Sequence, residues 1–84
     1  MFLHIADVAY RGGHRLELHF NDGAVKEVDL QNELHGDVFE PLQKIDLFRQ
    51  VAIHPDTQTI EWPNDADFAP EFLHRIGKTV RQSA

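Results

Sequence analysis

The sequence predicts a small α+β domain whose antiparallel sheet of about five strands is a three-stranded meander plus a hairpin. Two observations support this fold class. Short segments with alternating apolar and polar residues are separated by turn residues, which is typical of strands. Near the end of the chain, apolar residues recur every four positions, the period of an amphipathic helix. Because 84 residues suffice for only one core, we treat residues 1–84 as a single domain.

The meander is expected to comprise residues 2–9, 15–20 and 24–30. The second of these strands alternates most clearly, with Leu16, Leu18 and Phe20 on one face. Asn21, Asp22 and Gly23 follow it and are typical of a tight hairpin turn. The second and third strands should therefore pair directly.

The middle of the chain is irregular, because Gly36 and Pro41 interrupt any regular element between residues 31 and 50. We expect one or two short helical turns there. A second hairpin is predicted from residues 51–54 and 59–62. Pro63 should end its last strand, since proline has no N–H to donate to a sheet.

A C-terminal helix is predicted from Phe68, packed on one face of the sheet. Phe72, Ile76 and Val80 follow one another at four-residue intervals, which extends the apolar stripe to Val80. Gly77 lies within this stripe and should weaken the helix by about 1 kcal/mol relative to alanine.

The core is expected where the apolar faces of these elements converge. Trp62 has the same strand parity as Ile60, so we assign it to the core rather than to an exposed binding anchor, and its indole N–H then needs a partner. Phe39 and Phe48 are assigned to the core as well. The main core residues are predicted to be Leu16, Leu18, Phe20, Val28, Ile53, Ile60, Phe72 and Ile76.

The composition excludes several classes of function. Fourteen acidic against eight basic residues give a formal charge of −6, which disfavours direct binding to nucleic acid and favours a basic protein partner.

The chain has no cysteine, so disulfides, thiolate zinc sites and cysteine nucleophiles are excluded. Its one serine, Ser83, lies near the end of the chain without a visible base and orienting group, which argues against a serine hydrolase. Neither a signal peptide nor an apolar run of membrane-spanning length is present, so we expect a cytoplasmic protein without membrane contact.

Six histidines are candidates for a metal site, because neutral imidazole is a common ligand. Their spacing matches no metal motif, and His14 and His19 should point to opposite faces of a strand. We therefore expect no metal and no cofactor. The six are His4, His14, His19, His35, His54 and His74.

The densest acidic cluster, residues 61–67, follows the last predicted strand. Its oxygen atoms could hold a hard cation, but Asn and Asp side chains in such a position more often bind backbone N–H groups of their own turn. As a recognition loop, the cluster would contact a partner through Asn64, Asp65 and Asp67.

Two blocks, Val38-Phe39-Glu40-Pro41-Leu42 and Trp62-Pro63-Asn64, with the spacing between them, resemble a bacterial family known only as DUF2442. The resemblance implies an α+β domain with a small antiparallel sheet, no established catalytic residues, and relatives that look like components of two-gene toxin–antitoxin modules. Two departures concern turn and cap positions. Asp65 stands where many relatives have glycine, and Ala69 precedes Pro70 where an aspartate cap is common, although Asp67 could cap the helix instead.

The leading hypothesis is a non-enzymatic protein-interaction module, the acidic member of a toxin–antitoxin pair, that binds a basic protein. The alternative is a small metal-binding protein or hydrolase built from His and Asp residues, which requires at least three of them to converge in space. Nucleic-acid binding ranks last. Exposed edge strands would also allow a homodimer.

Overall fold

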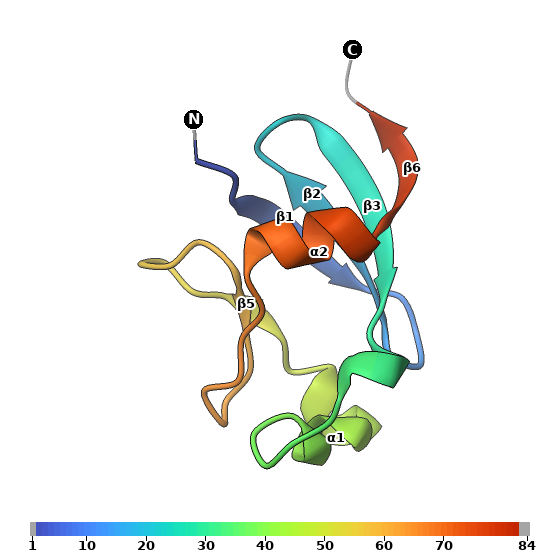
Figure 1. The fold of residues 1–84 in the computed structure, drawn as a ribbon, viewed down its shortest axis with the longest axis vertical. Helices are drawn as coiled ribbons and strands as arrows, with labels where there is room; N and C mark the ends of the chain where they lie inside the picture. Colours follow the sequence, from blue (N-terminus) through green and yellow to red (C-terminus); the bar gives the residue numbers. More distant parts are fainter. Residues whose placement is uncertain (1, 83–84) are drawn as a thin grey trace.

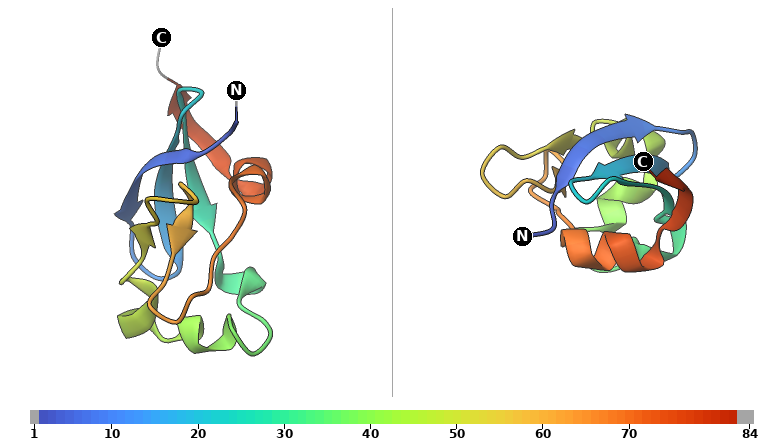
Figure 2. Two further views of the ribbon diagram at one scale, coloured as in Figure 1. Left: turned by 90° about the vertical axis from the view of Figure 1, so that its left-hand side faces the viewer. Right: turned by 90° about the horizontal axis from the view of Figure 1, so that it is seen from above.

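The α+β fold is confirmed by a computed structural model that describes residues 2–82, with side chains for residues 2–80. Strands β1, β2, β3 and β6 form a four-stranded antiparallel sheet in that order, and β4 pairs with β5 in a separate two-stranded sheet. Helix α2 lies across one face of the larger sheet, while the short helices gather at one end (Figures 1 and 2). The strands are β1 (Ile5–Tyr10), β2 (Arg15–Phe20), β3 (Ala24–Asp29), β4 (Ala52–Ile53), β5 (Ile60–Glu61) and β6 (Lys78–Gln82). The helices are η1 (Gln31–Glu33), η2 (Glu40–Gln43), α1 (Ile45–Phe48) and α2 (Pro70–Ile76).

The predicted meander is present. In the register of β2 and β3, Leu16 lies opposite Val28 and Leu18 opposite Lys26. Gly23, at φ 90°, completes the turn between them, and its N–H donates to the carbonyl of Phe20. Because directly opposite residues share a face, Lys26 is a charged residue on the apolar side of the sheet.

The predicted C-terminal helix is present but stops four residues before Val80. Helix α2 ends at Ile76, and residues 78–82 instead form β6, which pairs antiparallel with β3. A Cβ on Gly77 would lie 3.0 Å from Lys26 Cβ and 3.1 Å from Val28 Cγ2. A side chain at Gly77 would therefore be crowded against β3, and the chain leaves the helix there to pair with β3.

The core joins the two sheets. Five of the eight predicted core residues are buried, while Ile53, Phe72 and Ile76 are half-buried and pack against them. Trp62 is only 1 % exposed, as predicted, and its Nε1–H donates to the carbonyl of Phe48 at 2.6 Å. Phe48 is buried and Phe39 is half-buried against the same cluster. The second hairpin is therefore held to the rest of the domain through Trp62 and the α1 segment.

Strands β1 and β6 are the two edges of the larger sheet. Val80 of β6 is an exposed apolar residue. Pairing of two copies along such an edge, the homodimer expected from the sequence, stays a prediction.

Candidate functional site

The acidic turn predicted to contact a partner follows Trp62. The Asp65 N–H donates to the Trp62 carbonyl, and the Trp62 N–H donates to the carbonyl of Ala66, which closes the turn. Asp65 has φ 69°, a left-handed conformation that Asp, Asn and Gly tolerate best. The glycine expected at this position from the family resemblance thus has a physical explanation.

Asn64 has a structural role in this turn. Its Nδ2 donates to the carbonyl of Val38 at 2.8 Å, and its Oδ1 accepts the Ala66 N–H at 3.3 Å. The Asn64 side chain therefore ties the turn to the loop before η2. This matches the local reading in which an Asn side chain binds the backbone of its own turn.

Asp65 and Asp67 are exposed. Within residues 2–80, neither carboxylate makes a hydrogen bond or an ion pair. The backbone of Asp67 forms an isolated bridge with Glu61, and α2 begins at Pro70 after Ala69 without a side-chain cap. Asp67 is thus not the helix cap considered from the sequence, and both carboxylates are free to meet a partner.

The turn belongs to a larger acidic surface, which we call the helical end: residues 31–50 together with residues 62–67 (Figure 1). Six of the fourteen acidic residues lie there, against two of the eight basic ones. Val38 and Ile45, which are 48 % and 36 % exposed, add apolar surface. The acidic residues are Glu33, Asp37, Glu40, Asp46, Asp65 and Asp67, and the basic ones are Lys44 and Arg49.

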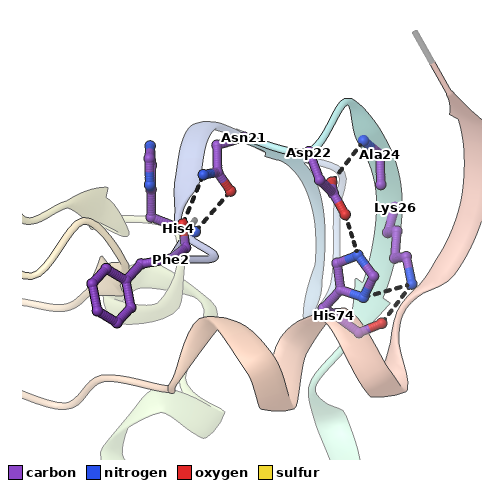
Figure 3. A network of polar contacts seen from close by, with 7 residues as sticks. All are labelled: Phe2, His4, Asn21, Asp22, Ala24, Lys26 and His74. Atoms are coloured by element: carbon purple, nitrogen blue, oxygen red, sulfur yellow. Dashed lines mark hydrogen bonds and ion pairs between the residues drawn. The ribbon is translucent and has the colours of Figure 1, made fainter.

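The most extended polar network lies at the opposite end of the sheet and was not anticipated from the sequence (Figure 3). His74 of α2 places Nε2 2.9 Å from Asp22 Oδ2, in the turn between β2 and β3. Lys26 Nζ lies 3.2 Å from His74 Nδ1 and donates to the His74 carbonyl. Phe20 packs edge-on against the imidazole at 4.8 Å. Lys26, His74 and Asp22 together fasten α2 to the β2–β3 hairpin.

These contacts favour one tautomer of the histidine. Asp22 accepts a hydrogen bond from Nε2–H, so a neutral ring in this tautomer offers its Nδ1 lone pair to the Lys26 ammonium. The Ala24 N–H that donates to Asp22 lowers the pKa of this carboxyl from its ordinary value of 3.8, and the His74 hydrogen bond lowers it further against partial desolvation. No hydroxyl or thiol nucleophile takes part, so we interpret the network as structural.

A single sequence signal pointed towards this network. Lys26 lies two residues before Val28 in the predicted strand. The strand pattern therefore places both side chains on the same apolar face, where the lysine charge needs a partner. The identity of that partner was not readable, because His74 lies 48 residues away on a helix.

The other histidines are dispersed. His14 Nε2 donates to the carbonyl of Gln43, whereas His19 pairs with Glu17 at 3.0 Å on the opposite face of the sheet. Arg11 also binds Glu17, and the hydrogen bonds from His19 and Arg11 hold the pKa of Glu17 below its ordinary value. Among residues 2–82, no group of three or more His, Asp or Glu side chains is placed to hold a metal ion.

One histidine faces a hollow, the arrangement closest to the alternative enzymatic hypothesis. His54 and Glu61 line a shallow hollow of about 260 Å³, with His54 Nε2 3.8 Å from Glu61 Oε2. His54 Nδ1 accepts the backbone N–H of Asp56, so this ring nitrogen is already used in the turn. Thr59 of this hairpin is buried and donates to the carbonyl of Phe68, and the Thr57 backbone N–H lies 3.4 Å from the same His54 Nδ1. Within the described residues, no hydroxyl is hydrogen-bonded to His54 or Glu61, as an activated nucleophile would require.

Comparison with known proteins identifies the family. A family model described as "Protein of unknown function (DUF2442)" matches residues 5–79. The chain belongs to DUF2442. No curated protein and no solved structure matches this DUF2442 chain.

Ser83 lies outside the described residues. None of the helices in the described part of the chain has the length and apolar character to cross a bilayer.

Proposed function

We propose that this DUF2442 protein is a non-enzymatic interaction module that binds a basic protein, as the acidic member of a toxin–antitoxin pair in the cytoplasm. The observation that carries the proposal is the helical end, where acidic residues outnumber basic ones six to two and five of the six acidic residues are exposed. An unbalanced charge of this kind accelerates encounter with a positive surface and repels phosphate backbones.

The turn after Trp62 supports the choice of contact residues. Asn64 is anchored to Val38, so Asp65 and Asp67 project from a turn that is already ordered. Pre-ordering matters because a partner then pays little conformational entropy to engage the two carboxylates. The absence of cysteine in the sequence agrees with a reducing compartment.

The test is a pull-down with the product of the adjacent gene, repeated across salt concentrations. The informative variant is Asp65→Asn with Asp67→Asn, because asparagine removes the charge while tolerating the left-handed conformation of Asp65. Binding should weaken, and its salt dependence should become shallower.

A matched control removes two exposed charges elsewhere. Asp7 on β1 and Asp56 in the β4–β5 turn are both exposed and lie outside the helical end. Asp7→Asn with Asp56→Asn changes the net charge equally and should leave partner binding within about twofold of the parent, because exposed charges far from the contact are screened. A parallel shift assay with DNA and RNA tests the opposing hypothesis. Tight nucleic-acid binding with no protein partner recovered would contradict the proposal.

A further inference from the structure

The helical end contains a hollow of about 710 Å³, lined by Asp37, Glu40, Pro41, Gln43, Lys44 and Leu47. We propose that this hollow receives an arginine side chain of the basic partner. The inference rests on the proposed function and names the chemistry that this surface recognises. The aliphatic part of the arginine would lie over Pro41 and Leu47, with its guanidinium group at Asp37 and Glu40.

The wall of the hollow is held by backbone hydrogen bonds. The carbonyl of Gly36 accepts the N–H groups of Phe39 at 3.1 Å and Glu40 at 2.8 Å, which folds the segment carrying both carboxylates into one turn. Gly36 has φ 90°, as this turn requires. The backbone that carries the two carboxylates is therefore fixed before a ligand arrives.

Its base is fixed by contacts with the rest of the domain. Gln43 Nε2 donates to the carbonyl of Leu34, and the Gln43 carbonyl accepts a hydrogen bond from His14 of the hairpin before β2. Leu42, next in sequence to two lining residues, is fully buried. The hollow is thus part of the packed domain.

The charges of the lining favour a cation. Asp37 and Glu40 outnumber Lys44, and the surrounding helical end has the same sign. Arginine fits better than lysine because its planar guanidinium can bind two carboxylates at once and its stem packs on apolar groups such as Pro41 and Leu47.

The hollow and the acidic turn are linked at Val38. Exposed Val38 lies between Asp37 of the hollow and the chain leading into η2, and its carbonyl binds Asn64 of the turn. Exposed Ile45 flanks Lys44 on the other side. A basic segment with one apolar contact and at least two cations would thus satisfy the hollow and the turn together.

The probe is an acetylated and amidated pentapeptide of alternating leucine and arginine, titrated into the ¹⁵N-labelled protein. Its comparison peptide has citrulline in place of arginine, which keeps the shape and removes the charge. We expect amide shifts concentrated in residues 36–47 with the arginine peptide and none of comparable size with the citrulline peptide.

The decisive variant is Asp37→Asn with Glu40→Gln. It should weaken arginine-peptide binding about tenfold, the effect typical of losing charge-assisted hydrogen bonds. The matched control, Asp7→Asn with Asp56→Asn, removes two exposed carboxylates that lie outside the helical end and do not line the hollow, and it should change binding less than twofold, since remote charges act only through a screened field. Far-UV circular dichroism verifies that each variant is folded.

Equal weakening in both double variants, or shifts spread over all acidic segments, would show unspecific charge attraction and overturn the inference. The arginine site and the interaction module can be tested independently. If the adjacent gene product still depends on Asp65 and Asp67 but ignores Asp37→Asn with Glu40→Gln, the interaction module stands and the arginine site is wrong. If no partner is recovered, the peptide titration still tests whether the hollow binds arginine.

Discussion

At the residue scale, single backbone and side-chain positions explain features that composition could not. The sequence allowed Asn64 to be a turn residue or a partner contact, and its side-chain amide closes the turn and reaches across to Val38. Asp65 combines a left-handed backbone conformation with an exposed side chain. Neighbouring polar residues in one short turn therefore serve different purposes.

The left-handed conformation of Asp65 predicts an unusual order of stabilities. Asp65→Gly should be more stable than Asp65→Ala by about 1 kcal/mol, because only glycine adopts positive φ without a steric cost. Urea denaturation of both variants measures the difference.

Asp67 provides the matched control, since it is not among the residues with positive φ and its backbone takes part in a bridge. There the order should reverse, with glycine less stable than alanine by roughly 0.5–1 kcal/mol. The same order at both positions would contradict the assigned conformation of Asp65.

Gly77 is a residue whose effect depends on its neighbours. In a continuous helix, Gly77→Ala would add about 1 kcal/mol of stability. In this structure the new methyl group would meet Lys26, Val28 and the Leu73 carbonyl at 3.0–3.1 Å, so we expect a loss of roughly 1–3 kcal/mol from overpacking. The urea midpoint gives the sign, and a stabilised variant would mean that the helix continues past Ile76.

At the element scale, the attachment of α2 depends on polar contacts as well as on its apolar face. With seven residues, α2 is too short to be stable alone. It is held by buried Leu73 and by the contacts of His74 with Asp22 and Lys26. Lys26 also satisfies a carbonyl in the last turn of the helix, where a positive charge interacts favourably with the helix dipole.

The lowered pKa of Asp22 predicts a pH dependence of stability. A carboxyl whose pKa is depressed by folding contributes stability that is present above its unfolded pKa, near 3.8, and is lost as the pH falls through the lower folded value. The stability advantage of the parent over Asp22→Asn should therefore be present at pH 6 and shrink below pH 3.8.

The size of this effect should be under about 1 kcal/mol, because the Asp22 side chain is 36 % exposed and screened by water. Paired urea titrations of the parent and Asp22→Asn at pH 6 and pH 3 measure it, with Asp56→Asn as a control for net charge. A stability difference that does not change with pH would contradict the lowered pKa of Asp22 in the folded protein.

At the scale of the whole molecule, the two sheets share one core and should unfold together. Trp62, the only tryptophan, lies beyond the end of β5 and bonds to Phe48, whereas most of the strand content lies in the larger sheet. Leu16 of β2 and Ile60 of β5 belong to the same buried cluster. The smaller sheet, with two residues in each strand, has too little pairing to persist alone.

We therefore expect the tryptophan fluorescence and the far-UV circular dichroism to give coincident unfolding curves in urea. Leu16→Ala should shift both curves by the same amount, corresponding to about 2–5 kcal/mol for a large-to-small change in a core. Separate midpoints would mean that the β4–β5 hairpin and its short helices unfold independently of the main sheet.

Local sequence determined much of this protein. The alternation of Leu16, Leu18 and Phe20 gave the right strand and the right buried face, because strand periodicity is a property of adjacent residues. The turn at Gly23 and the burial of Trp62 were also predictable from near neighbours, whereas the last hairpin strand ends at Glu61, one residue earlier than predicted. The acidic turn was located correctly, since its residues are contiguous.

Tertiary structure decided the rest, wherever residues distant in sequence compete for the same segment. The four-residue spacing of Phe72, Ile76 and Val80 favours a helix locally, but the open edge of β3 offers hydrogen bonds that a helix past Gly77 would leave unused. The close approach of Gly77 to Lys26 and Val28 exists only in the folded chain. Three further features also depend on contacts or chain reversals that no local pattern encodes. They are the contacts of Lys26, the hydrogen bond of Asn64 to Val38 and the hollow beside η2.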